Sequence, residues 1–197
     1  MPKIVDHEKR REEIVQAARE VVLESGSAGL TLRRLAQQMG VANGALRLYF
    51  STKSEVIEAL FQDAVARTRA DLVARGYYSQ RGLAGLRTIY AILLPRDAEG
   101  VANLRIPVAL QSEITTDPEL AAVWVEAQEM LRDRTVQHLQ EAIDDGEVDG
   151  RHPAEVTTYL LMNFAFGRAS AQLVPGVHAE HHPAMDESAF EALLDAA

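Results

Sequence analysis

Asn43 and Arg47 form a pair well suited to recognising the hydrogen-bonding groups of another molecule. They stand four apart, so on a helix they share one face. Asparagine can bond adenine and arginine can bond guanine in the major groove of DNA. Arg47 could equally hold a phosphate, and this alternative stays open. Lys53 follows at a predicted helix start, where its ammonium can join backbone N–H groups around a phosphate, the alternative being a solvated lysine.

Two arginines and an aromatic pair flank these residues. Arg33 and Arg34 lie in the first turn of a predicted helix over residues 32–39, where positive charge opposes the helix dipole. They are therefore not placed for helix stability, and we expect one to contact a phosphate and the other to be a surface charge. Tyr49 and Phe50 end the next short helix, and Phe50 is expected in the core.

The helices that must carry these residues can be predicted from caps, stops and hydrophobic spacing. Thr31 suits an N-cap and Gly40 a helix end, while Thr52 and Glu55 form a capping-box pattern. The sequence shows no strand-like alternation bounded by hairpin turns, which predicts an all-α fold. About nine helices are predicted, over residues 8–25, 32–39, 42–49, 53–75, 81–94, 99–115, 118–145, 153–174 and 186–196.

The first two short helices meet at Gly40 with a spacing typical of a helix-turn-helix. Ala36 is small enough to let the second helix cross closely, Gly40 permits the positive φ of a tight turn, and Leu46 faces back into the crossing. By itself this spacing suits an ordinary α-hairpin equally well. A second helix of about eight residues would be about 12 Å long, which matches a major groove about 12 Å wide.

The flanking residues extend the pattern. It comprises Thr31-Leu-Arg-Arg-Leu-Ala36, Gly40-Val41, Gly44-x-Leu46, Tyr49-Phe50 and Lys53-x-Glu55-Val56. With these residues, positions 10–60 resemble the DNA-binding head of the TetR (tetracycline-repressor-like) family of transcriptional regulators. Beyond them only the order and lengths of the helices agree. The resemblance implies an N-terminal three-helix head, a helical effector-binding body and a homodimer.

Three positions depart from the usual residues of that family. It often has Ser or Thr where this chain has Ala42 and Ala45, and often Tyr where it has Arg47. The Tyr-Phe pair and Lys53 are retained, so the resemblance carries over the fold and the phosphate clamp but not the bases read. It also places the Tyr49 hydroxyl on a phosphate. The residues predicted to contact DNA are Thr31, Arg33, Ala42, Asn43, Gly44, Ala45, Arg47, Leu48, Tyr49 and Lys53.

Charge is unevenly distributed along the chain. Of 20 Lys/Arg and 29 Asp/Glu, residues 1–54 hold nine and six, or +3, and the remainder hold eleven and twenty-three, or −12. A basic head on an acidic body suits a protein that offers one end to a polyanion. The 197 residues suffice for a DNA-binding domain at 1–56 and an effector-binding and dimerisation domain at 57–197.

Several classes of protein are excluded or disfavoured. The absence of cysteine excludes disulfides, thiolate metal sites and a cysteine nucleophile. There is no apolar run of signal-peptide length, and the apolar stretch 159–166 is too short to span a bilayer, so a cytoplasmic chain without membrane contact is expected. No phosphate loop, zincin motif or triad points to an enzyme, and neither cofactor nor metal is expected. The metal-like cluster His178-Ala-Glu-His181-His182 is interpreted as solvated loop histidines.

The predicted helix over 153–174 is apolar nearly all round, so it should be covered on both sides. One side can face its own body and the other a partner, and small residues four apart would allow close approach. Together with the helix over 186–196 it forms the predicted dimer interface, the alternative being a core helix in a monomer. The residues assigned to the interface are Phe164, Gly167, Ala171 and Leu193.

Polar or aromatic residues within the apolar body helices are candidates for lining an effector pocket. Pro107, inside the helix over 99–115, should kink or break it and could open a cavity. The predicted function is a ligand-responsive regulator, a repressor on a palindromic operator; the alternative is a dimeric helical interaction or ligand-binding module whose head no longer binds DNA. The pocket candidates are Tyr90, Arg105, Gln111, Trp124, Asn163 and Phe166, followed by Glu113 and Arg168.

Overall fold

The computed structural model describes residues 7–95, 97–171 and 183–195, and within these ranges it contains helices and turns but no strand. The all-α prediction is confirmed. Short 3-10 turns, Ser27–Gly29 and Tyr77–Ser79, follow α1 and α4. The helices are α1 (His7–Ser25), α2 (Leu32–Gln38), α3 (Asn43–Leu46), α4 (Lys53–Ala74), α5 (Gly82–Leu93), α6 (Ala98–Ala109), α7 (Gln111–Ile114), α8 (Pro118–Asp144), α9 (Ala154–Ala171) and α10 (Pro183–Asp195).

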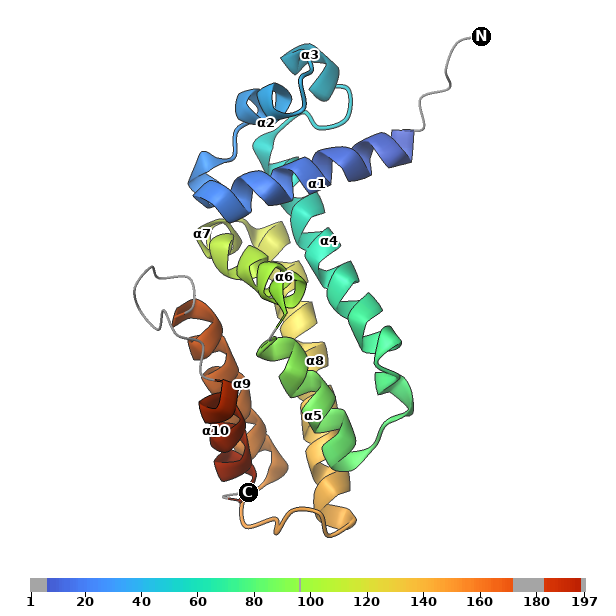
Figure 1. Ribbon diagram of the computed structural model, residues 1–197, viewed down its shortest axis with the longest axis vertical. Helices are drawn as coiled ribbons and strands as arrows, with labels where there is room; N and C mark the ends of the chain where they lie inside the picture. Colours follow the sequence, from blue (N-terminus) through green and yellow to red (C-terminus); the bar gives the residue numbers. More distant parts are fainter. Residues whose placement is uncertain (1–6, 96, 172–182, 196–197) are drawn as a thin grey trace.

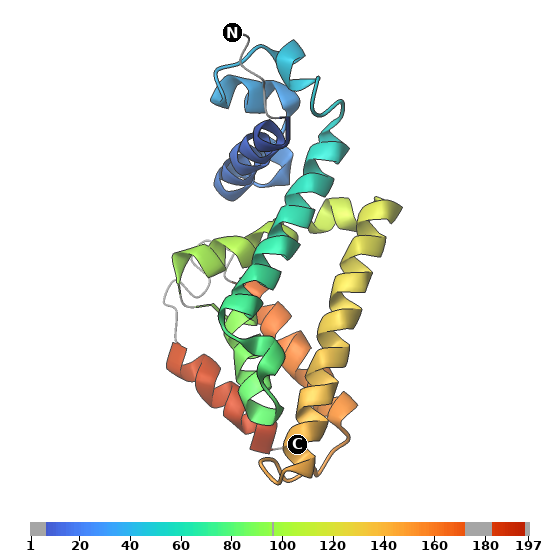
Figure 2. The same ribbon diagram turned by 90° about the vertical axis from the view of Figure 1, so that its right-hand side faces the viewer.

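The molecule is elongated, with α1, α2 and α3 forming a head at one end of its long axis (Figure 1). The long helix α4 begins in the head, crosses behind α1 in the view of Figure 1 and continues along the body (Figures 1 and 2). In the body, α5 packs against both α4 and α8, while α9 packs against α8 and α10. The predicted domain boundary at residue 56 falls inside α4, which is continuous from Lys53 to Ala74.

The predicted helix starts in the head are confirmed by their hydrogen bonds. The Thr31 hydroxyl accepts a hydrogen bond from the Arg34 N–H at 3.1 Å. The Thr52 hydroxyl accepts one from the Glu55 N–H at 3.2 Å, and the Glu55 carboxylate accepts one in return from the Ser51 N–H at 2.9 Å. Both caps satisfy N–H groups that a helix start leaves without an intrahelical partner.

Three predicted helix bounds are wrong. The helix predicted over 42–49 is α-helical only over Asn43–Leu46, because the Tyr49 and Phe50 N–H groups both bond the Leu46 carbonyl in a closing turn that brings the Phe50 ring into the core. The helix predicted over 99–115 is divided into α6 and α7 at Leu110, whereas Pro107 lies inside α6. The last helix begins at Pro183, a residue type suited to a first helical position.

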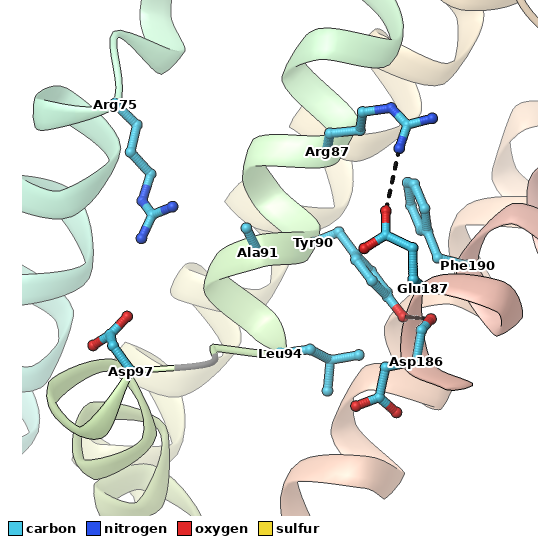
Figure 3. Close-up of a pocket in the computed structure, with 9 residues that line it drawn as sticks. All are labelled: Arg75, Arg87, Tyr90, Ala91, Leu94, Asp97, Asp186, Glu187 and Phe190. Carbon is cyan, nitrogen blue, oxygen red and sulfur yellow. Dashed lines mark hydrogen bonds and ion pairs between the residues drawn. The ribbon is translucent and has the colours of Figure 1, made fainter. Parts of the chain in front are cut away.

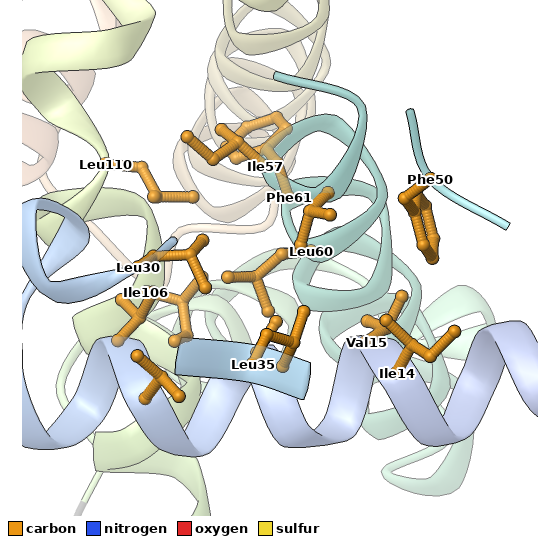
Figure 4. Close-up of a cluster of buried hydrophobic side chains, with 14 of the residues drawn as sticks. Ile14, Val15, Leu30, Leu35, Phe50, Ile57, Leu60, Phe61, Ile106 and Leu110 are labelled. Atoms are coloured by element: carbon orange, nitrogen blue, oxygen red, sulfur yellow. The ribbon is translucent and has the colours of Figure 1, made fainter. Parts of the chain in front are cut away.

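Buried apolar side chains form two separate clusters. The first, called here the upper cluster, joins the head to the body: Leu35 and Phe50 of the head share it with Phe61 of α4, Ile106 of α6 and Leu110 (Figure 4). Phe50 is fully buried in this cluster, as predicted. The second, called here the lower cluster, lies between α5, α8, α9 and α10, and includes Leu86, Leu139, Leu161 and Phe190.

Candidate nucleic-acid interface

The turn between α2 and α3 has the geometry predicted from Ala36, Gly40 and Leu46. Gly40 has a φ of 65°, a left-handed value that favours glycine. The Gly40 N–H bonds the Gln37 carbonyl and the Val41 N–H bonds the Ala36 carbonyl, which together make a Schellman motif. Ala36 and Leu46 are both buried where the two helices cross. The helix-turn-helix prediction is confirmed over the alternative of an ordinary hairpin.

Residues 42–49, called here the recognition segment, present an exposed surface beyond this turn. Ala42, Asn43, Gly44, Ala45 and Arg47 are all exposed, and so is Leu48, whose exposed fraction is 79%. A Cβ added to Gly44 would meet no heavy atom within 4 Å. The Asn43 and Arg47 side chains bond no other residue of the described ranges, so their donors and acceptors are available to a partner.

The end of the recognition segment is held by α1. The Arg11 guanidinium donates a hydrogen bond from Nη1 to the Tyr49 carbonyl at 2.7 Å and lies 4.2 Å from the centre of the Phe50 ring. The His7 ring lies 5.3 Å from the half-buried Tyr49 ring. Sequence reasoning missed Arg11 and His7, because these contacts join residues about forty positions apart and leave no local pattern.

The cations predicted to contact phosphate differ in their surroundings. Arg33 is exposed and bonds no other described residue, whereas Arg34 lies 3.4 Å from the Glu24 carboxylate. The Lys53 ammonium donates to the Ser27 carbonyl at 2.8 Å, so in this structure it is not simply solvated. A phosphate contact by Arg33 or Lys53 stays a prediction.

Glu113 of α7 brings the body up to this same lysine. Its carboxylate lies 3.8 Å from the Lys53 ammonium and accepts a hydrogen bond from the Ser112 hydroxyl at 2.6 Å. Burial raises the pKa of Glu113, but hydrogen bonds from Ser112 and Ser27 and the charge of Lys53 outweigh it, so the pKa is lowered overall. The sequence makes Glu113 a pocket candidate, whereas the structure makes it a charged contact between body and head.

The six pocket candidates are not gathered in one place. Trp124 and Phe166 do come together, with ring centres 6.4 Å apart, and Trp124 also lies 6.0 Å from Phe61. Arg105 and Gln111 are exposed, and Asn163 is exposed with its amide donating to the Tyr159 carbonyl. Trp124 and Phe166 therefore connect α8 and α9 at the edge of the upper cluster.

Tyr90, the sixth candidate, lies in a surface hollow between α5 and α10 (Figure 3). Its ring stacks on Phe190 with centres 4.1 Å apart, and its hydroxyl donates to the Asp186 carbonyl. The Asp186 carboxylate forms two hydrogen bonds, at 2.7 and 3.1 Å, with Arg168. The hollow measures about 280 Å³ and is lined by Arg75, Arg87, Tyr90, Ala91, Leu94, Asp97, Asp186, Glu187 and Phe190.

One face of α9 is exposed along its length and is called here the α9 stripe. It comprises Val156, Tyr159, Leu160, Asn163 and Gly167, of which Val156, Tyr159 and Leu160 are 46%, 68% and 42% exposed. The predicted interface residue Gly167 lies in this stripe. Phe164 and Leu193 pack at the edge of the lower cluster, and Ala171 is half-buried at the end of α9.

Two sequence predictions concern metal and membrane. The cluster from His178 to His182 lies outside the described residues. Within the described ranges, no helix combines the length and apolar character that crossing a bilayer requires.

These features define the class of the protein: a helix-turn-helix head, with an exposed segment suited to DNA, on a helical body. Residues 14–60 match the family described as "Bacterial regulatory proteins, tetR family". The chain is 32% identical, over 156 residues, to the HTH-type transcriptional repressor AcnR of Corynebacterium diphtheriae, covering 77% of this chain and 75% of that protein. The chain belongs to the TetR family. It is therefore a transcriptional regulator and not an enzyme.

Two further similarities concern one part of the chain and the whole fold, respectively. The HTH-type transcriptional regulator PksA of Bacillus subtilis is 42% identical, but over only 78 residues, or 38% of either chain. A TetR transcription regulator from Haloarcula marismortui has a similar structure, with a TM-score of 0.80, 20% identity and coverage of 96% of this chain and 98% of that one. At this identity the likeness supports the fold alone.

Proposed function

We propose that this chain is a repressor that binds a palindromic DNA operator as a homodimer and leaves it when a small organic effector binds the body. The observation that carries the proposal is the recognition segment, with Asn43 and Arg47 exposed beyond the Schellman turn. The similarity to AcnR, which is named a repressor, supports repression. Residues 1–56 contact DNA in the cytoplasm, and residues 57–197 bind effector and partner.

In this proposal the head divides its contacts between bases and phosphates. Asn43 and Arg47 face base edges, and the small residues Ala42, Gly44 and Ala45 allow close approach. Lys53 holds a phosphate, and Thr31, Arg33, Leu48 and Tyr49 line the same surface. Since phosphate contacts carry no sequence information, the preference for an operator comes from the recognition segment.

The α9 stripe supports the homodimer. Val156, Tyr159 and Leu160 are apolar side chains left exposed on one helix face, which is typical of an interaction surface. A recognition segment with a four-residue helix reads few bases, so specificity needs two heads. Related by a two-fold axis, two heads about 34–36 Å apart enter successive major grooves on one side of DNA.

Trp124 supports an effector site between the two buried clusters. Its indole ring contacts Phe61 of the upper cluster and Phe166 of α9, so a ligand at this position would touch elements attached to both. A ligand that prefers the body conformation with unsuitable head spacing releases DNA by differential binding. Screening metabolites for a shift in melting temperature and for release of bound DNA tests this part.

The decisive experiment is a mobility shift with the chain's own upstream DNA region and a random duplex of equal length. We expect saturable binding to the upstream region, with at least about a thousandfold preference over random DNA at physiological salt. Footprinting of the shifted complex should reveal two symmetric half-sites. Binding to neither duplex would instead favour an interaction module with a DNA-inactive head.

A further inference from the structure

The recognition segment cannot hold its own conformation. Its α-helix is four residues long, and Arg47, Leu48 and Tyr49 follow as a turn. Isolated helices of fewer than about 12 residues are marginal in water, because nucleation is costly. Leu46, the last residue of α3, and Phe50, just beyond the segment, anchor it in the core, but every other residue from 42 to 48 is exposed. The direction of the segment must therefore depend on contacts from outside it.

Arg11 supplies such a contact at the point where the segment returns to the core. The hydrogen bond from Arg11 to the Tyr49 carbonyl, at 2.7 Å, involves a backbone group that no following helical turn satisfies. The same guanidinium lies over the Phe50 ring, with Cζ 4.2 Å from the ring centre. A planar guanidinium can donate in its plane and stack through its face at once, which an ammonium cannot do.

His7 extends this contact by one turn of α1. Residues 7 and 11 are four apart, so they lie on the same face of the helix. The His7 ring packs against the Tyr49 ring, while Arg11 contacts the Tyr49 carbonyl and the Phe50 ring. One face of α1 therefore contacts both residues of the aromatic pair.

We infer that Arg11 is a positioning residue that sets the orientation of the recognition segment and thereby its base preference. It acts through Tyr49 and Phe50 and touches no base itself. The inference rests on the proposed DNA contact of the segment. A phosphate contact by Arg11, which is exposed and cationic, is the competing role and predicts a different dependence on DNA sequence and salt.

Arg10 provides a matched control for charge. It is the neighbouring cation of α1, and its guanidinium pairs with Glu13 on the same helix rather than with the aromatic pair. Arg11→Met and Arg10→Met remove the same charge from the same helix turn. Arg11→Lys keeps the charge and removes the planar group. Because Arg11 is exposed, these variants should fold, and thermal melting checks this.

The first measurement needs no DNA. Amide hydrogen exchange of Tyr49 and Phe50, whose N–H groups bond the Leu46 carbonyl, should be faster in Arg11→Met and unchanged in Arg10→Met. Unchanged exchange in both variants would overturn the positioning role whatever the protein does with DNA. If the wild-type chain bound no operator, the proposed function would fail while this exchange result still decided whether Arg11 holds the segment.

The second measurement compares operator with random DNA. Arg11→Met should weaken operator binding by about 5- to 150-fold, the range for losing one base pairing, while its effect on random DNA should match that of Arg10→Met. Arg11→Lys should also lose operator preference. Two outcomes would assign Arg11 to a phosphate contact and overturn the inference. One is that Arg11→Lys keeps the operator affinity of the wild type. The other is that Arg11→Met weakens binding to both duplexes equally, with a slope of log affinity against log salt concentration that is shallower by about 0.9 per phosphate released.

Discussion

Enlarging Gly167 should separate the stability of the protomer from its association. Gly167 is exposed in the C-terminal part of α9, and a Cβ added there would meet no heavy atom within 4 Å in the single chain. Gly167→Ala replaces a poor helix former by the best one, which favours the helix by about 0.8–1.0 kcal/mol. The isolated protomer should therefore become more stable, because its own packing offers no opposing clash.

The dimer should respond in the opposite direction. If the α9 stripes of two copies cross at Gly167, an added side chain is crowded against the partner, and overpacking of a close contact costs typically about 1–3 kcal/mol. That corresponds to an increase of about 5- to 150-fold in the dissociation constant of the dimer. Gly167→Leu should be at the upper end, since its side chain projects further than a methyl group.

Sedimentation over a concentration series measures the dissociation constant of the dimer. Denaturant unfolding at low protein concentration measures the free energy of unfolding of the protomer. Gly44→Ala is the matched control, since Gly44 is also helical, exposed and free of atoms within 4 Å of an added Cβ but lies in the head. Its association should equal that of the wild type. Unchanged association in Gly167→Leu would remove Gly167 from the interface, and a wild-type monomer at every concentration would refute the homodimer.

The remaining predictions concern the DNA surface and one buried ion pair. Lys53→Ala should weaken binding to operator and to random DNA alike. The slope of log affinity against log salt concentration should become shallower by about 0.9 for each phosphate no longer bound, or about twice that for two heads. Asn43→Ala should weaken the free energy of operator binding by about 1–3 kcal/mol per base pairing lost and leave binding to random DNA unchanged. Arg47→Ala will instead weaken binding to both kinds of DNA, as Lys53→Ala does, if Arg47 contacts the DNA backbone. Asp186→Asn leaves the Arg168 guanidinium without its buried carboxylate, and should lower the free energy of unfolding by about 3 kcal/mol in a denaturant titration.

Local hydrogen bonding explains why so much of the head could be predicted from sequence. Thr31, Thr52 and Gly40 act on backbone groups within five residues of themselves, so their effect is readable from residue type and spacing. The burial of Phe50 could be predicted but the end of α3 could not, since the turn after Leu46 depends on where residues of other helices receive the Phe50 ring. The contacts of Arg11 could not be predicted for a similar reason.

The body was harder to interpret because apolar residues in helices do not say which of several faces or clusters they join. Tyr90 and Trp124 are both aromatic residues within apolar helices, so the sequence does not distinguish them. In the structure Tyr90 stacks on Phe190 of α10, whereas Trp124 contacts α4 and α9. Similarly, the position of Phe164 in an apolar helix predicts an interface residue, but the exposed face of α9 is the one that carries Tyr159.

The upper cluster gives the proposed effector response a physical route to the head. Ile106 and Leu110 are fully buried against the head, and exposing either would cost about 1.5–3 kcal/mol, so α6 and α7 cannot shift far without carrying the head with them. Glu113 adds a charged contact to Lys53 from the same part of the body. Trp124 lies at the edge of this cluster and also contacts Phe166. A ligand that displaced this indole ring would therefore act on a packed unit that includes the base of the head.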